Sequence, residues 1–380
     1  MKIDLTKKVV GLLLLSLLFL SGCGVFKGEQ TLEQIDSPPE DAQFTDDLEN
    51  APEESEDTGD GTEEGGEEGI VEDDNEGQTE DEESSTTGES VSRMLYLIDQ
   101  NGLVVPHEVE LPTPASKEVA KQVLEYLVKD GPVSSMLPTG FQAVLPAGTE
   151  ILSLNLEEGT LIVDVSEEFK NYEAENEAKI LEAMTYTLTQ FENVENVQLR
   201  IDGQALSEMP VNGTPIENGY SRANGINVHQ AAGVDFMESK ATTLYFPMQG
   251  EESVYFVPIT QHVETTGDNA YQNIVQALLD GPGFDLPLTP YMNTGSALTA
   301  EPVMKDGVLS LTFNENILSN SEKSVIADEV MKSIVLTLTE QEGINAVEVM
   351  VENHEQVFNE KEQPYNEPVS KDMVVPTESI

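Results

Sequence analysis

Asp130-Gly131-Pro132 ends a run of helical spacing, and the same tripeptide returns at Asp280-Gly281-Pro282 after a second such run. Sliding the sequence along itself by this distance, about 150 residues, aligns further segments of like character. A match that recurs at one distance is typical of a duplicated domain, so the sequence predicts two copies of one unit. The aligned segments are Leu95-Tyr96 with Leu244-Tyr245, Leu137-Pro138 with Leu286-Pro287, and Thr187-Leu188-Thr189-Gln190 with Thr337-Leu338-Thr339-Glu340.

The first copy is predicted to contain two β-hairpins, two helices and a final strand, in the order ββαββαβ. A hairpin over 94–105 surrounds an Asn-Gly turn signal. A helix over 116–129 follows, because its apolar residues repeat at i, i+3, i+4 and i+7 before the Gly-Pro pair stops it. Alternating apolar residues predict a second hairpin over 152–165 and a last strand over 197–201, with a helix over 175–191 between them. The apolar face of this second helix is assigned to Leu181, Met184, Leu188 and Phe191.

The second copy repeats this order with apolar residues on the same faces, except that Pro302 interrupts the strand near Leu298 and Val303. We therefore predict an α+β fold of two tandem repeats, each roughly ββαββαβ, after a disordered acidic N-terminal tether. The predicted parts are a signal peptide at 1–22, the tether at 23–92, a first domain at 93–209, a linker at 210–240, a second domain at 241–357 and an extended or frayed C-terminal tail at 358–380.

The charge of the chain is strongly negative, with 72 acidic and 18 basic residues and a formal net charge of −54. Such a charge repels nucleic acid, so DNA and RNA are excluded as partners. Residues 29–90 hold 26 of the acidic residues and no Lys or Arg, and they contain too few apolar side chains to fold. We interpret them as a solvated spacer. A cation or partner site in this run stays open, although no loop with calcium-binding spacing appears there.

Cys23 is the single cysteine, and its position indicates export and lipidation. An apolar run over 9–20 follows three lysines and is too short to span a bilayer, as in a signal peptide. Leu20-Ser21-Gly22-Cys23 resembles a bacterial lipobox, in which lipid is attached to the cysteine thiol, with acyl chains such as palmitate. The alternative is an ordinary signal-peptide residue. With the lipid, the membrane is a partner through Cys23, and the folded part lies on the extracytoplasmic face of the cell membrane.

Three motifs carry a family resemblance. They are the helix before Asp-Gly-Pro, the segment Leu145-Pro146-Ala147-Gly148-Thr149, and the strand end Asp164-Val165-Ser166-Glu167-Glu168-Phe169. In a lipoprotein with an acidic tether, they resemble the GerM sporulation and germination lipoprotein family, with its tandem GerMN domains, over about residues 93–355. The second copy departs from the pattern, because it has Thr312-Phe313-Asn314-Glu315-Asn316-Ile317 at the strand end and no Pro-Ala-Gly-Thr. A specific role of the motif would therefore belong to the first copy.

The resemblance implies a part in spore formation. It implies a lipoprotein in the space between mother cell and forespore membranes that helps to assemble a complex bridging them. Its expected partners are proteins of the forespore envelope complex, with stage II sporulation protein Q as a candidate, and further copies of itself as a homo-oligomer. The αββαβ part of each repeat is similar to ring-building modules of secretion systems, which is an analogy of fold alone.

Nothing in the sequence converges on a catalytic, cofactor or metal site, so we predict no enzyme, no cofactor and no metal. There is no Gly-x-Ser-x-Gly elbow and no phosphate-binding glycine loop, although a serine nucleophile without a motif stays open. The histidines are predicted to be surface or loop residues, since none has a partner at metal-ligand spacing. They are His107, His229, His262 and His354.

Asp164 and Ser166 are the one tempting polar pair, because they end a strand that could face a cleft. Asp and Ser at a strand end more commonly bond the backbone N–H groups of the following turn or helix, and we prefer that interpretation. Asp130 and Asp280 suit helix-terminating turns, with the next glycine at positive φ.

Three hypotheses follow from these observations. The first is a structural or assembly lipoprotein, because a tandem offers free strand edges and helix faces at a fixed spacing. The second is a lipoprotein that binds a solute or a cell-wall ligand, which usually has two lobes around one cleft. The third is a cell-wall enzyme. Repeats that each have their own sheet favour the first.

Overall fold

The computed structural model of the chain describes residues 90–114, 119–230, 237–251, 253–265 and 270–374, all within one compact unit. The predicted signal peptide, the predicted lipidation site Cys23 and the predicted tether as far as residue 89 lie outside the described residues. Over the ranges that are described, no helix is both long enough and apolar enough to cross a bilayer.

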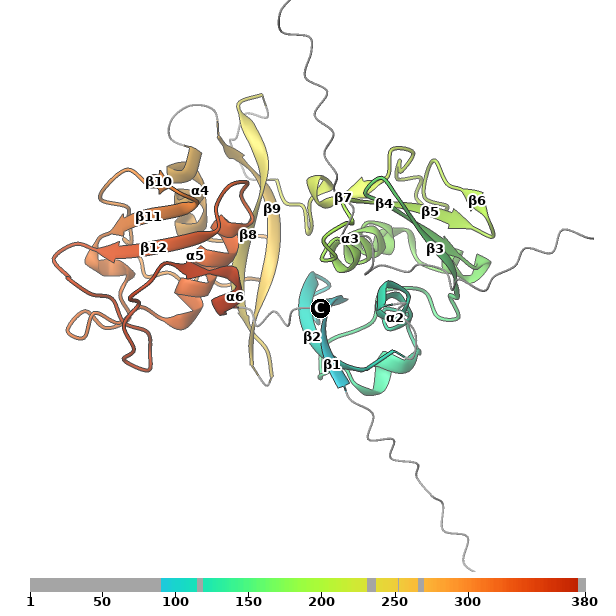
Figure 1. The fold of residues 1–380 in the computed structure, drawn as a ribbon, viewed down its shortest axis with the longest axis horizontal. Coiled ribbons are helices and arrows are strands. Elements are labelled where there is room, and N and C mark those ends of the chain that lie inside the picture. The colour runs from blue at the N-terminus through green and yellow to red at the C-terminus, as the bar shows by residue number, and fades with distance from the viewer. Residues whose placement is uncertain (1–89, 115–118, 231–236, 252, 266–269, 375–380) are drawn as a thin grey trace, which may run out of the picture. The chain divides into compact units, whose positions relative to one another are not determined.

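The first repeat has the predicted order ββαββαβ, and both predicted hairpins form (Figure 1). β1 pairs with β2 and β3 pairs with β4, in each case antiparallel, and β4 runs parallel to β5. The elements are β1 (Ser90–Ile98), β2 (Val104–Pro112), α2 (Val119–Glu125), β3 (Ile151–Glu157), β4 (Thr160–Val165), α3 (Glu177–Leu188) and β5 (Asn196–Ile201), with 3₁₀ turns η1 (Pro132–Ser135), η2 (Glu167–Lys170) and η3 (Ala174–Asn176).

The second repeat has the same order, which confirms the duplication. Its first sheet strand is reduced as predicted, because β10 has three residues after Pro302, and Leu298 reaches Phe313 through an isolated bridge. The elements are β8 (Ser239–Gln249), β9 (Val254–Glu264), α4 (Ala270–Asp280), β10 (Val303–Lys305), β11 (Val308–Phe313), η5 (Glu315–Ile317), α5 (Asp328–Thr339) and β12 (Ala346–Val351).

In each repeat one helix lies between the opening hairpin and the sheet. α3 contacts β1 and β2 on one side and β5 on the other, and α5 contacts β8 and β12 in the same way (Figure 1). The prediction of a single apolar face for α3 was too narrow: Tyr186, Thr187 and Glu182 are buried as well. A helix covered on two sides has little room for a solvated face.

A matched hydrogen bond fixes the hairpin to this helix in both repeats. The Tyr96 N–H donates to Thr187 Oγ1 at 3.0 Å, and the Tyr245 N–H donates to Thr337 Oγ1 at the same distance. Each threonine comes from the repeated Thr-Leu-Thr motif. The motif is therefore part of the fold, since it satisfies a buried backbone donor of the hairpin.

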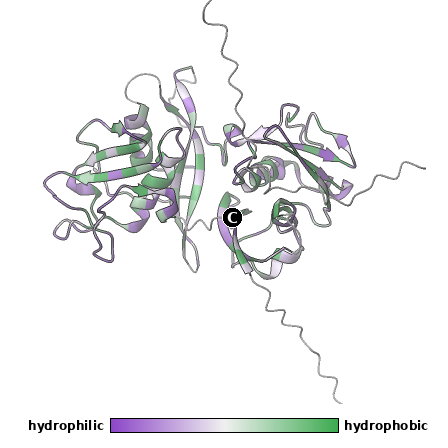
Figure 2. Cartoon of the chain, viewed as in Figure 1, coloured by the Kyte–Doolittle hydropathy of each residue, from purple (hydrophilic) through white to green (hydrophobic). Residues whose placement is uncertain are grey.

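Each repeat has its own hydrophobic core, built from strand residues that alternate inward and from the central helix. Figure 2 shows the hydrophobic residues along these strands and helices. One exception joins the repeats: Val105 of β2 is fully buried and belongs to the core of the second repeat, and Phe141 packs against both cores.

Short segments after β5 and β12 extend the two sheets at equivalent places. Tyr220–Ser221 (β7) pairs with β5, and Val369–Ser370 (β13) pairs with β12. An extended or frayed tail was predicted at the second of these places, but residues 369–374 form β13, which pairs with the sheet, and α6 (Lys371–Val374). Two-residue strands carry no periodicity in the sequence, which is why the pattern does not reveal them. The first repeat also has β6 (Gln204–Ala205) and η4 (Arg222–Asn224).

The two Asp-Gly-Pro turns differ in backbone conformation. In the second repeat Gly281 has φ +83°, as predicted. In the first repeat the prediction was wrong by one residue, because Asp130 takes φ +60° and Gly131 has φ −83°. Gly131 is still needed there, since a Cβ would lie 2.9 Å from the carbonyl oxygen of Val128.

Candidate functional site: the joint between the repeats

Polar side chains meet where the first repeat contacts the second, and we call this cluster the joint. It consists of Asp99, Arg222, Asn227, Tyr255 and Glu340, together with the groups they bind. Residues 222–229 of the predicted linker supply two of its members.

Asn227 connects a strand of each repeat. Its Oδ1 accepts the N–H of Val104 at 2.8 Å, and its Nδ2 donates to the carbonyl oxygens of Val104 at 2.7 Å and Pro258 at 2.8 Å. Val104 lies in β2 and Pro258 in β9. The Asn227 side-chain amide thus forms hydrogen bonds with backbone groups of both strands, in place of the bonds that a neighbouring strand would make. Asn227 has φ +47°, a conformation that Asn adopts more readily than most residues.

The chain on either side of Asn227 pairs with β9. The Ile226 N–H donates to Thr260 Oγ1 at 2.9 Å, and the Thr260 N–H donates to the Ile226 carbonyl at 2.9 Å. The His229 N–H donates to the Thr260 carbonyl at 2.8 Å. Gly225 permits this approach: it has φ +84°, and a Cβ there would lie 2.9 Å from Thr260 Cγ2. Residues 226–229 of the connecting segment are therefore attached to the second repeat, whereas Tyr220–Ser221 of the same segment pair with β5 of the first.

A second contact joins the tip of the first hairpin to β9. The Tyr255 hydroxyl donates to Asp99 Oδ2 at 2.8 Å, and Asp99 is buried with 2% of its surface exposed. Asp99 Oδ1 accepts the N–H groups of Asn101 and Leu103, each at 2.9 Å. Phe141 packs edge-on against the Tyr255 ring at 5.2 Å between centroids. Burial and the Asp99 carboxylate both raise the pKa of Tyr255, so the hydroxyl keeps its proton as a donor.

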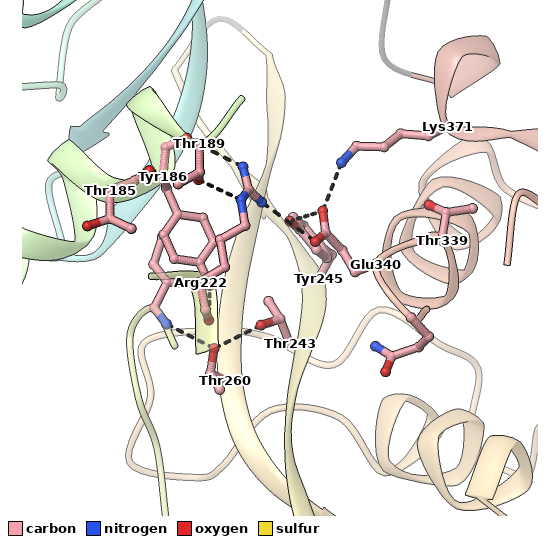
Figure 3. Close-up of polar contacts among 12 residues, drawn as sticks. Thr185, Tyr186, Thr189, Arg222, Thr243, Tyr245, Thr260, Thr339, Glu340 and Lys371 are labelled. Atoms are coloured by element: carbon pink, nitrogen blue, oxygen red, sulfur yellow. Dashed lines mark hydrogen bonds and ion pairs between the residues drawn. The ribbon is translucent and has the colours of Figure 1, made fainter. Parts of the chain in front are cut away.

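Glu340 receives cations from both repeats (Figure 3). Arg222 Nη1 lies 3.6 Å from Glu340 Oε2, and Lys371 Nζ donates to Oε1 at 2.8 Å. The Tyr245 hydroxyl donates to Oε1 at 3.2 Å. Burial alone would raise the pKa of Glu340, but Lys371 and Arg222 outweigh it and the pKa is lowered. The carboxylate is therefore held in its charged form.

The first repeat positions Arg222 for this contact. Its Nε donates to Thr189 Oγ1 at 2.8 Å, and its guanidinium lies over the Tyr186 ring, 4.6 Å from the centroid (Figure 3). Arg222 follows β7 as Lys371 follows β13, and Glu340 occupies the position of Gln190. Two equivalent cations thus reach one carboxylate, because the equivalent residue in the first repeat is neutral.

Glu182 is the buried acid beside the joint. It lies in α3 with 5% of its surface exposed, and its Oε2 accepts the N–H of Asn227 at 3.1 Å. Burial raises its pKa to about 7, and the Asn227 N–H and the charge of Lys179 offset this only in part. The support beneath Asn227 therefore changes charge near neutral pH.

The prediction that Asp164 and Ser166 cap the following turn or helix was wrong, because the backbone N–H groups that they accept belong to neighbouring loops. Asp164 accepts the N–H of Gly203 at 3.0 and 3.1 Å, and Ser166 Oγ accepts the N–H of Glu150 at 3.0 Å. Neither side chain caps η2. Each holds a turn beside the sheet and serves the fold.

The four histidines lie apart; His107 and His262 lie in strands, not loops, and both are half-buried. His354 has partners that the sequence does not reveal: Nδ1 lies 2.6 Å from Ser324 Oγ, and Nε2 lies 3.9 Å from Glu315 Oε1. Among residues whose placement is described, no group of three metal-binding side chains occurs.

The Ser324 arrangement resembles a catalytic triad in composition only. The backbone donors around it already have acceptors: the Ser324 N–H bonds the Ser321 carbonyl, and the Val325 and Lys323 N–H groups bond Asn320. A serine nucleophile needs free donors for the oxyanion. The Ser324–His354 bond instead holds the turn before α5, where Ser324 has φ +57°.

Sequence reasoning missed Arg222, Asn227 and Glu340 as site residues. Arg222 and Asn227 lie in a segment without periodicity, which favoured the interpretation as a linker. One signal was available: Tyr220-Ser221-Arg222 and Val369-Ser370-Lys371 stand at the distance of the repeat. Extending the comparison beyond the last predicted strand would have paired the two cations.

The fold and the joint define a tandem α+β repeat protein in which buried and half-buried polar groups hold one repeat against the other. Comparison with known proteins agrees. The family described as "Germane: Sporulation and spore germination" matches residues 94–207 and 243–357. The chain belongs to this family of sporulation and spore germination proteins.

Relatives support this assignment over nearly the whole chain. The spore germination protein GerM of Bacillus subtilis (strain 168) is 40% identical over 374 residues, covering 97% of this chain and 96% of the relative. The solved structure of the tandem GerMN domains of the sporulation protein GerM from Bacillus subtilis matches with a TM-score of 0.68 and 43% identity, covering 74% of this chain and 97% of that one. The relationship supports a role in sporulation or germination.

Proposed function

We propose that the protein is a structural or assembly factor that presents its two repeats as one body to a protein complex in the spore-forming cell. The joint carries this proposal. Contacts of the buried Asp99 and of the half-buried Asn227 and Arg222 hold the repeats together, and Val105 adds to the core of the other repeat. Two surfaces held at fixed spacing favour multipoint binding of partners.

The proposed location is the extracytoplasmic face of the cell membrane, with lipid on Cys23 as the anchor. During sporulation this face borders the space between mother cell and forespore membranes. The lipobox supports the anchor, and the acidic run of 29–90 supports a spacer that keeps the repeats away from the lipid. The proposed partners are forespore envelope proteins, with stage II sporulation protein Q as a candidate, and further copies of the chain.

A solute-binding role is the second candidate, and the joint weighs against it. A binding protein of two lobes needs a cleft between them, but Tyr255, Phe141 and Arg222 fill the contact between the repeats. In the described part of the chain, one hollow of about 210 Å³ lies on the outer face of the first sheet, and another holds only about 10 Å³. A drug-sized ligand is usually bound in a larger, more enclosed site. No arrangement that supports catalysis was found among the described residues, so we propose that the protein is not an enzyme.

Crosslinked pull-down from sporulating membranes tests the proposal. The full chain with an affinity tag should recover integral proteins of the forespore envelope, and an Asn227→Gly variant with a weakened joint should recover less of them. A Cys23→Ala variant separates anchoring from assembly, because it should leave the membrane fraction while purified protein still binds the recovered partner. An empty pull-down from crosslinked wild-type cells would contradict the assembly role. Uptake defects rescued by excess nutrient would favour the solute-binding candidate.

A further inference from the structure

One edge of the first sheet is open. β3 pairs with β4 on one side, and no other described residue bonds the backbone of 151–157. The opposite edges of both sheets are covered in part by the chain itself, through β7 on β5 and β13 on β12. An uncovered strand presents unpaired N–H and C=O groups, to which another extended chain can bind.

The second repeat protects the equivalent edge. The registers of the two hairpins align Met304 with Leu156 and Lys305 with Glu157, which places Pro302 at the position of Leu154. A proline removes a backbone donor, a lysine opposes edge pairing, and β10 is three residues long. β3 has seven residues and contains neither a proline nor a lysine, although a bulge between Ile151 and Ser153 interrupts its pairing with β4 at one end. The duplicated edges have therefore diverged.

The charge around β3 selects the partner. β3 and β4 contain no Lys or Arg, and exposed acids lie at the ends of β3, namely Glu150, Glu157 and Glu158. Without the tether and residues 1–28, the chain keeps 45 acidic and 14 basic residues, a net charge of −31. Such an edge attracts a segment with basic ends.

A second copy of β3 fits this edge poorly. Antiparallel pairing centred on Leu154 would place Glu150 of one copy opposite Glu158 of the other, at both ends of the pair. Like charges opposite one another destabilise strand pairing. The acidic ends therefore favour a partner of opposite charge.

We propose that β3 of the first repeat is a docking edge for an extended segment of a protein partner with Lys or Arg at its ends. The segment adds a strand to the sheet, so that main-chain hydrogen bonds give affinity and the acidic ends give selectivity. This inference rests on the proposed assembly function and assigns its binding surface to one of the two repeats.

The docking edge is tested by titrating the purified chain, without its predicted signal peptide, with peptides of defined sequence. A peptide Lys-Lys-Val-Thr-Val-Thr-Val-Lys-Lys should bind, with shifts confined to backbone amides of β3 and β4 in NMR spectra. Methylation of its alternate backbone nitrogens, or replacement of its lysines by glutamates, should weaken binding at least about tenfold. Absence of binding, or equal binding by the methylated peptide, would overturn the proposal.

A double variant of the protein provides the second arm. Asn155→Lys with Glu157→Lys places two lysines at exposed positions of β3 and should weaken binding of the basic peptide at least about tenfold. Val303→Lys is the matched control, because β10 then carries lysines at the same two positions and peptide binding should not change. Equal loss in both variants would mean a general charge effect and would overturn the docking edge.

The same variants in the crosslinked pull-down separate this inference from the proposed function. If the wild type recovers envelope proteins and the β3 double variant recovers them equally, the docking edge is wrong and the assembly role stands. If the wild type recovers none, the assembly role itself fails. Loss of partners with the β3 variant, but not with Val303→Lys, is the expected result.

Discussion

Arg222 of the first repeat lies 3.6 Å from Glu340 of the second, measured from Nη1 to Oε2. The two repeats differ in charge at equivalent positions: residue 190 of the first repeat is a neutral Gln, and the equivalent residue of the second is the acidic Glu340. Duplication alone would give each repeat its own cation and its own partner. One neutral position in the first repeat leaves its cation available to the other repeat.

Arg222→Ala should lower the free energy of unfolding by about 2 kcal/mol, because Glu340 keeps Lys371 but loses a partly buried charge partner. Chemical denaturation of the purified repeats measures this. Lys170→Ala is the control: its ion pair with Glu167 is exposed, and its removal should change stability by less than about 0.5 kcal/mol. Equal effects of the two variants would contradict the role of the joint.

A double-mutant cycle between Arg222→Ala and Glu340→Gln should give a coupling energy of about 1 kcal/mol. Gln is the residue that the first repeat has at the equivalent position, so it preserves the shape of the side chain. Coupling near zero would mean that the two charges do not act on one another across the joint.

Asn227→Gly should destabilise the protein by about 3 kcal/mol, because three side-chain hydrogen bonds are lost and two strands keep unpaired backbone groups. Glycine retains the positive φ, so backbone strain does not enter. Asn353→Gly is matched in conformation, with φ +62°, but its side chain makes only an exposed bond to Glu315. A loss no larger than that of Asn353→Gly would show that Asn227 does not connect the strands.

Glu182 should make stability depend on pH. Its pKa is about 7 in the folded chain against an ordinary 4.5, so the folded state binds the proton more tightly and stability falls as pH rises from 4.5 to 7. The full difference is about 3 kcal/mol. Glu182→Gln removes this dependence, so it should raise the melting temperature relative to wild type more at pH 8 than at pH 5. The same slope in wild type and variant would contradict the assignment.

Ser324 should not react as a nucleophile, because the backbone donors beside it are already bonded. A fluorophosphonate probe is expected to label neither the wild type nor a Ser324→Ala variant. Labelling that disappears in the variant would require an enzymatic function to be considered again.

The repeated Asp-Gly-Pro turns and the alternation of apolar residues predict the element order of both repeats, because both patterns are local and follow the geometry of strands and helices. The burial of α3 on two sides was not predictable in the same way, since the hairpin that covers its second face is distant in the chain. The joint is harder still to predict from the sequence. Tyr255 and Asp99 are 156 residues apart, and neither stands out from its neighbours by type or spacing.

Hydrogen exchange after a substitution in one core tests most directly whether the two repeats act as one body. Met184→Ala removes a fully buried side chain of the first core and should cost about 3 kcal/mol. If the joint couples the repeats, the most protected amides of β4 in the first repeat and of β11 in the second should lose protection by the same free energy. Loss in β4 with unchanged protection in β11 would contradict the account.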